Sequence, residues 1–199
     1  MREGILFILS GPAGSGKTTL IKRLIEKFSD IRFSISCTTR KKRPGELDGV
    51  DYRFLSEVEF KEMIRKGSFA EWATVHGNLY GTPMKELENS RSTGADLLLD
   101  LDVQGARNIR DKYRSGVYIF VAPSSFDVLR ERLIKRRSDE QCEIMKRLED
   151  AKKEMEEVQI YDYIIINDSL DEALEKLAAI LVAERCKKDR VLGLIEGNF

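Results

Sequence analysis

The chain has 199 residues, of which 42% are hydrophobic and 34% charged, a balance typical of a globular domain with an apolar core. Lysine plus arginine and aspartate plus glutamate each number 34, so net charge gives no reason to expect a nucleic-acid or membrane partner. Three widely spaced cysteines and one histidine disfavour a zinc site or a disulfide framework and favour a reducing, cytoplasmic location.

The first predicted element is a buried strand at 4–10, an apolar run bounded by glycines. Its apolar part, 5–9, is too short for a signal peptide or a membrane span. A helix is predicted over 17–28, because Leu20, Leu24 and Phe28 fall on one face of it.

Residues 11–18, between this strand and helix, read GPAGSGKT and match the phosphate-loop pattern GxxxxGK[ST] without a mismatch. The glycines let backbone N–H groups surround phosphate oxygens, and the helix N-terminus adds partial positive charge. In such a loop Lys17 reaches the β- and γ-phosphates of ATP and the Thr18 hydroxyl binds Mg²⁺. An ordinary glycine-rich turn is the alternative. The predicted ATP-binding residues here are Gly11, Pro12, Ala13, Gly14, Ser15, Gly16, Lys17, Thr18 and Thr19.

Residues 32–83 interrupt the alternation of strands and helices. Strands are predicted at 50–56 and 69–75 with a short helix at 57–66 between them, which indicates a small β-rich insertion. Within it, Arg40 and Arg43 precede a Pro-Gly turn, and Tyr52 and Tyr80 follow. Planar guanidinium groups suit phosphate, so a second phosphate site is predicted, although a basic run alone is more often a solvated surface.

Further buried strands are predicted at 95–102, 116–122 and 162–167, and helices at 103–114, 125–137, 140–161 and 170–188. Apolar strands alternating with helices predict an α/β fold, in which a parallel sheet is covered on both faces. The first of these strands ends in Asp100 and Asp102, whose side chains point the same way because they lie two residues apart. Each is a candidate for the Mg²⁺ shell, or alternatively for capping the next helix.

Four motifs, in order, resemble those of the guanylate kinase family across essentially the whole chain. They are the phosphate loop, S-x-T-T-R-x-x-R-P-G-E-x-x-G-x-x-Y from Ser36, E-W-A followed by G-N-x-Y-G-T, and L-D-x-D-x-Q-G. The phosphate loop is common to many NTPases, whereas the other three together are specific. The resemblance implies a P-loop NTPase-type sheet flanked by helices, with a GMP-binding insertion and a helical lid. It also implies Mg²⁺-dependent transfer of the γ-phosphoryl group of ATP to GMP, with dGMP as a further acceptor.

By the same resemblance, one domain, 1–199, divides into a core (1–33, 84–124 and 162–199), the insertion (34–83) and the lid (125–161). The implied GMP-binding residues are Ser36, Arg40, Arg43, Tyr52, Glu71, Tyr80, Thr82 and Asp102. The implied catalytic residues are Lys17, Arg40, Arg43, Arg132, Arg136 and Arg147. Asp100 is implied to act on Mg²⁺ through water, and Asn167 to contact adenine. In the lid, a solvated basic face is the alternative, and the choice between Arg136 and Arg137 stays open.

The chemistry of guanine agrees with these assignments. Guanine presents N1–H and N2–H as donors and O6 as an acceptor, so Glu71 can accept from the base while Thr82 or Ser36 donates to it. Adenine has an acceptor at N1 and a donor at position 6, which leaves the same groups mismatched. The alternative for Glu71 is an ion pair at the rim of the site.

No general base is expected, because a phosphate monoester has a second pKa of about 6 and is largely a dianion near neutrality. Two other functions are compatible with the phosphate loop: a P-loop kinase for another acceptor, and a non-catalytic guanylate-kinase-like module that binds peptides. Glu71, Thr82 and Asp102 argue against the first, and the intact Lys17 and Thr18 against the second. The expected partners are therefore ATP and GMP, without nucleic acid or membrane.

Overall fold

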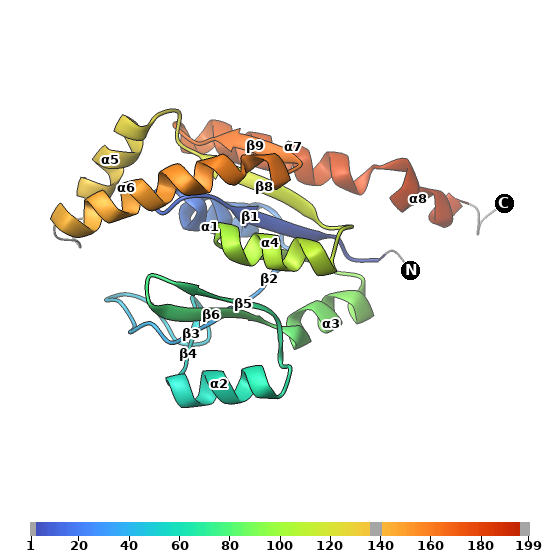
Figure 1. The fold of residues 1–199 in the computed structure, drawn as a ribbon. Helices are drawn as coiled ribbons and strands as arrows, with labels where there is room; N and C mark the ends of the chain where they lie inside the picture. The colour runs from blue at the N-terminus through green and yellow to red at the C-terminus, as the bar shows by residue number, and fades with distance from the viewer. Residues whose placement is uncertain (1–2, 136–140, 196–199) are drawn as a thin grey trace.

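The central sheet of the molecule is parallel and carries helices on both faces (Figure 1). A computed structural model describes residues 3–135 and 141–195. In these residues the sheet has the strand order β2 (Ile31–Phe33), β7 (Asp96–Asp100), β1 (Leu6–Ser10), β8 (Val117–Ala122) and β9 (Tyr163–Ile166). Helices α1 (Lys17–Lys27) and α7 (Leu170–Arg185) pack on one face, and α3 (Met84–Thr93) and α4 (Val103–Lys112) on the other. The predicted α/β fold is confirmed.

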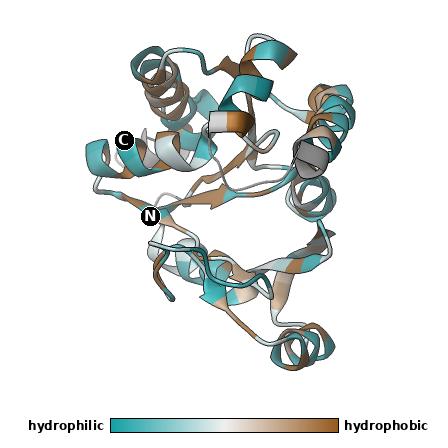
Figure 2. Cartoon of the chain, turned by 90° about the vertical axis from the view of Figure 1, so that its left-hand side faces the viewer, coloured by the Kyte–Doolittle hydropathy of each residue, from teal (hydrophilic) through white to brown (hydrophobic). Residues whose placement is uncertain are grey.

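Successive side chains of β1 point to opposite faces of the sheet, so this strand contributes to the hydrophobic core on both faces. Phe7 and Leu9 pack in one cluster with Leu24 of α1, whereas Ile8 packs in another with Ile109 of α4. All five side chains are fully buried. Hydrophobic residues accordingly follow the central strands in Figure 2. This packing fixes the carboxyl ends of the strands, which is where ligands bind in open α/β sheets.

A second sheet is formed entirely within the predicted insertion, below the first sheet in Figure 1. Its order is β4 (Arg53–Phe54), β3 (Cys37–Thr38), β6 (Asn78–Pro83) and β5 (Phe69–Val75). Helix α2 (Glu57–Arg65) starts at a capping box formed by Ser56 and Glu59. It packs through Phe60, whose ring lies 4.5 Å from that of Phe69. The insertion therefore has its own small core.

The strand predicted at 50–56 is wrong for most of its length, since only Arg53–Phe54 pair as a strand. Side chains in the preceding turn bind the backbone instead: Asp51 accepts from the Leu47 N–H at 2.8 Å, and Asp48 from the Phe54 N–H at 2.9 Å. Such local bonds compete with strand pairing, and they explain why a β-branched, aromatic segment forms a loop here.

The helical pair at the left of Figure 1 consists of α5 (Phe126–Lys135) and α6 (Gln141–Glu156). Leu129 and Leu133 of α5 pack against Leu148 and Ala151 of α6. A 3₁₀ turn, Glu157–Ile160, follows α6, so this helix is shorter than predicted. The last described helix is α8 (Lys188–Ile195). Within the described ranges, no helix is long and apolar enough to cross a membrane.

Candidate active site

The predicted phosphate loop leaves the carboxyl end of β1 and enters α1. Gly11 and Gly16 hold φ angles of 136° and 91°, a region that residues with a Cβ rarely adopt. Space is equally restrictive: a Cβ on Gly16 would lie 2.4 Å from the Asn167 side-chain nitrogen, and one on Gly11 would lie 2.1 Å from the Val121 carbonyl oxygen. These glycines allow the tight loop that turns its backbone amides inward.

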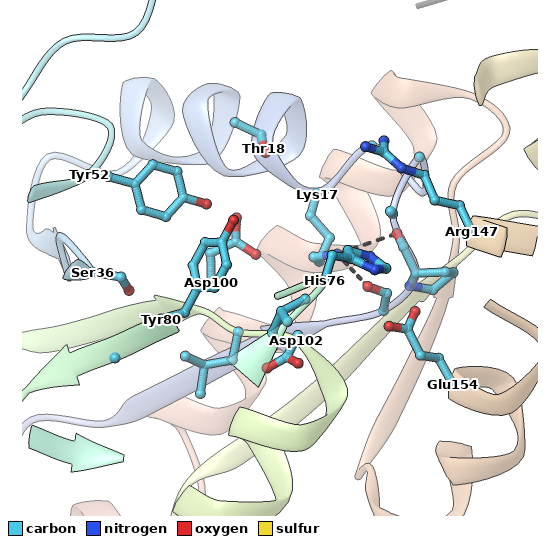
Figure 3. A pocket seen from close by; sticks show the side chains of 18 of the residues that line it. Lys17, Thr18, Ser36, Tyr52, His76, Tyr80, Asp100, Asp102, Arg147 and Glu154 are labelled. Atoms are coloured by element: carbon cyan, nitrogen blue, oxygen red, sulfur yellow. Dashed lines mark hydrogen bonds between the residues drawn. The ribbon is translucent and has the colours of Figure 1, made fainter. Parts of the chain in front are cut away.

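The ammonium group of Lys17 lies on this loop and donates to the carbonyl oxygens of Gly11 and Pro12, the latter at 3.4 Å (Figure 3). Asp100 lies nearby at the end of β7. Burial raises the pKa of the Asp100 carboxyl group, and the charge of Lys17 opposes that rise. Lys17 thus has hydrogen-bond partners within the phosphate loop itself.

Thr18 and Asp100 line the same cavity as Lys17 and offer oxygen ligands of the type that Mg²⁺ prefers. Across residues 3–135 and 141–195, no cluster of three or more His, Cys, Asp and Glu side chains could hold a metal. The side-chain oxygens of Thr18 and Asp100 would suit a Mg²⁺ ion whose other ligands are water and nucleotide phosphate, as is usual for this metal.

The cavity of about 200 Å³ joins the phosphate loop, the insertion and the helical pair. Among the predicted site residues that line it are Gly11, Pro12, Ala13, Gly14, Gly16, Lys17, Thr18, Ser36, Arg43, Tyr52, Glu71, Tyr80, Asp100, Asp102 and Arg147. In Figure 3, Ser36, Tyr52 and Tyr80 lie on one side of Lys17, and Arg147 on the other. A neighbouring cavity of about 880 Å³ shares Thr18, Arg43 and Arg147 with the first.

Glu46, which was not predicted as a site residue, fixes Arg40. The guanidinium group donates to both Glu46 carboxylate oxygens, at 2.7 and 3.1 Å, and its Nε donates to the Tyr80 hydroxyl at 3.2 Å. Glu46 also accepts from the backbone N–H of Arg43 at 2.8 Å, and Arg40 lies 5.4 Å from the ring centre of Tyr52. Two arginines and two tyrosines are thereby held together. The available signal was an acid directly after the Pro-Gly turn.

Glu71 lines the cavity, lies at the pairing of β5 with β6, and is 4% exposed. Its Oε1 accepts from the backbone N–H and the hydroxyl of Thr82, at 3.1 and 2.7 Å. Burial raises the pKa of Glu71 to about 7, although the Thr82 bonds lower it. This is a buried position, not the rim ion pair considered as the alternative.

Asp102 caps the next helix, which was one of the two roles considered for it. Its Oδ1 accepts from the Gly105 N–H at 2.9 Å and caps α4, while the side chain still lines the cavity. Burial raises the pKa of Asp102, and the bond from Gly105 opposes that rise. Capping leaves the other carboxylate oxygen able to accept a further hydrogen bond.

Arg132 and Asn167 are not among the residues that line this cavity, but they lie beside the phosphate loop. A shallow groove there includes Gly14, Gly16, Thr19 and both of these residues. The Asn167 amide donates to the Ser15 carbonyl oxygen at 2.7 Å, and Arg132 reaches the Asp168 carbonyl oxygen at 3.5 Å. Arg136 and Arg137 lie outside the described residues.

His76 and Glu154 also line the cavity, although neither was predicted as a site residue. His76 lies in the turn between β5 and β6 with a φ of 47°, and its Nδ1 is 3.3 Å from Asp150 Oδ2 of α6. Glu154 projects from α6, and burial raises its pKa to about 7 against the opposing charge of Lys17. No sequence pattern marks these contacts, because they join segments far apart in the chain.

Comparison with known proteins gives concordant results. A family model described as guanylate kinase matches residues 3–184. A guanylate kinase of Geobacter metallireducens is 50% identical over 198 residues, covering 100% of this chain and 98% of the relative. One of Thermotoga maritima is 44% identical over 194 residues, covering 98% and 94%. The crystal structure of a guanylate kinase from Anaplasma phagocytophilum has a TM-score of 0.83 at 34% identity, covering 100% and 97% of the two chains.

Proposed function

The chain belongs to the guanylate kinase family, and from this premise we propose which of its residues bind and activate ATP and GMP. Family membership makes it a nucleotide kinase that transfers a phosphoryl group of ATP to GMP. One observation supports the assignment of residues above others. The cavity that holds Lys17 of the phosphate loop also holds a buried carboxylate, Glu71, suited to reading a guanine base.

On the ATP side, the loop 11–18 receives the phosphates, and Lys17 turns from the carbonyl oxygens of Gly11 and Pro12 to the β- and γ-phosphates. Asn167, bonded to this loop, lies beside the adenine. The proposed lid arginines, Arg132, Arg136 and Arg147, neutralise charge on the transferred group; of these, Arg147 already lines the cavity.

On the GMP side, Arg40 and Arg43, with Tyr52 and Tyr80, bind the phosphate. Four other residues recognise the guanine base: Glu71, Thr82, Asp102 and Ser36. Because the Thr82 hydroxyl already donates to Glu71 Oε1, it positions the carboxylate, and Ser36 is left to donate to O6. The chain also accepts dGMP in this proposal.

Thr18, and Asp100 through water, would hold Mg²⁺, which neutralises phosphate charge and orients phosphate oxygens when bound. No side chain has to remove a proton, since the GMP phosphate is already largely a dianion near neutrality. The protein aligns two anions, offsets their repulsion with Lys17 and the arginines, and excludes water from the cavity. We further propose a cytoplasmic enzyme whose partners are these small molecules, without nucleic acid or membrane.

A substrate panel tests the proposed function. With ATP and Mg²⁺, we expect GMP and dGMP to be phosphorylated, and AMP, CMP and UMP to react at least about 10³-fold more slowly in kcat/KM, as follows when buried polar groups are left unpaired. A coupled assay for ADP measures each rate. Faster turnover of another monophosphate would support the alternative small P-loop kinase, and no turnover of any would support the peptide-binding module.

We also expect GMP to draw the insertion, 34–83, toward the core, because Arg40 and Arg43 must both reach its phosphate. Small-angle scattering should show a smaller radius of gyration with GMP than without it, and a pair of spectroscopic labels on 34–83 and on the core should report a shorter separation. AMP at the same concentration is the control. Profiles and label distances unchanged by GMP, by ATP and by both together would contradict domain closure.

A further inference from the structure

Gly105, in the first turn of α4, lies against the carboxylate of Glu71. A Cβ built on Gly105 would stand 2.9 Å from Glu71 Oε2 and 3.0 Å from Asp102 Oδ1. Glycine is not required by the backbone here, since the residue is helical and is absent from the described residues with positive φ. Helix propensity would favour alanine. A side chain at this position would occupy space that the carboxylates of Glu71 and Asp102 now fill.

We propose that Gly105 is a specificity-determining residue, which leaves the space in which the Glu71 carboxylate stands ready to pair with guanine. The inference rests on the proposed role of Glu71 as the reader of the base. Gly105 itself is not proposed to contact a substrate. It acts through Glu71, and so it is a positioning residue.

The surroundings of Glu71 leave its carboxylate little freedom to yield to a methyl group. Its other oxygen, Oε1, is held by both the N–H and the hydroxyl of Thr82. A carboxylate pushed by a side chain at position 105 must break these bonds or shift into the cavity that the base is proposed to enter. Either movement misplaces the acceptor oxygens.

Helix α4 is also held against β5 by hydrogen bonds, so it cannot move away from Glu71. Lys112 donates to the Ala70 carbonyl oxygen at 2.7 Å, and the Asn108 amide donates to the Trp72 carbonyl oxygen at 3.1 Å. These bonds tie α4 to β5 on both sides of Glu71 in the sequence. Because the helix and the strand are joined there, the side-chain oxygens of Glu71 and Asp102 are the parts that must move, and Glu71 Oε2 is the nearer of the two.

The test is Gly105→Ala, measured alone and in a Glu71→Gln background. We expect the KM for GMP to rise about tenfold or more, with the KM for ATP and the slow rate with AMP changed less than threefold, because a hydrogen bond broken at a buried oxygen has an effect of this size. The thermal unfolding midpoint should change by only a few degrees, because the better helix propensity of alanine offsets part of the cost of the displaced carboxylate. The matched control is Asp111→Ala, an exposed position in the same helix, which should leave all three values within twofold.

In the Glu71→Gln background, Gly105→Ala should add less than threefold to the loss for GMP, since residues that act through one contact are not additive. A normal KM for GMP in Gly105→Ala, beside a selective loss in Glu71→Gln, would overturn the inference and leave the role of Glu71 intact. Equal losses in both backgrounds, or for GMP and ATP alike with an unfolding midpoint lower by more than a few degrees, would also overturn it. If Glu71→Gln itself keeps full selectivity, the proposed base recognition fails, and this inference fails with it.

Discussion

Lys17→Ala is expected to lower kcat by about 10³-fold or more while the chain folds normally, which is the scale of losing one partner of the charge that develops in a transition state. Lys17 is the cation on the phosphate loop, and its ammonium group now bonds only to the carbonyl oxygens of Gly11 and Pro12 among the hydrogen bonds described. Those partly buried bonds lie within the loop and join no core side chain, so their loss should leave the core intact. Steady-state rates with ATP and GMP, and thermal unfolding, measure the two effects.

The matched control is Lys27→Ala, which removes an exposed ammonium group from the other end of the same helix. It should keep kcat within twofold of the unmodified protein. A Lys17→Ala enzyme that retains more than about a tenth of its turnover would be inconsistent with phosphate binding at this loop, because a directly acting cation contributes far more.

Glu71→Gln should lower kcat/KM for GMP roughly 30- to 1,000-fold, which corresponds to a loss of about 2–4 kcal/mol in transition-state stabilisation. The kcat/KM for AMP should fall much less. The amide keeps the size of the side chain but replaces one acceptor oxygen by a donor, which mispairs with the N–H groups of guanine. Glu71 is 4% exposed, so water cannot compensate. The decisive quantity is the GMP-to-AMP ratio of kcat/KM, because a folding defect would lower both values together.

Glu88→Gln, an exposed change of the same kind in α3, controls for charge and should not alter that ratio. A dependence on pH gives a second measure. Since the pKa of Glu71 is raised to about 7, protonation below that pH turns an acceptor into a donor. The GMP-to-AMP ratio should therefore fall as the pH drops through about 7, and Glu71→Gln should remove this dependence. Equal losses for both nucleotides would mean that Glu71 does not read the base and that Asp102 and Thr82 do.

The parts of the fold that could be predicted are those whose pattern is local. Strands β1, β7, β8 and β9 of the central sheet lie in apolar runs, and the phosphate loop is defined by eight consecutive residues. Strands β2, β3 and β6 escaped prediction. Strands β2 and β3 have only three and two residues, β6 contains Gly81 and Pro83, and all three depend on partners elsewhere in the chain. Helix α3 was missed because Leu87 and Ser90 are its only buried residues among those described, which gives almost no apolar stripe.

The site shows the same division between local and long-range signals. Residues within motifs could be proposed from the sequence, and the structure gathers most of them around one cavity. The bond from Thr82 to Glu71 and the helix cap at Asp102 could not be foreseen as geometry, because both depend on which oxygen faces which donor. The fixing of Arg40 by Glu46 and the approach of Gly105 to Glu71 likewise become visible only in three dimensions.

The contact between His76 and Asp150 joins the turn between β5 and β6, in the proposed insertion, to α6, in the proposed lid, and His76 also lines the cavity. A contact between two parts of a protein that move on ligand binding contributes the same coupling free energy whichever ligand binds first. If GMP strengthens this bond by shifting the insertion, the lid is favoured in the position that ATP requires, and the gain in affinity for ATP must equal the gain that ATP gives to GMP. If the insertion and the lid move as proposed, the pair His76 and Asp150 couples the binding of the two substrates, and the affinity for each, measured with and without the other, tests that coupling.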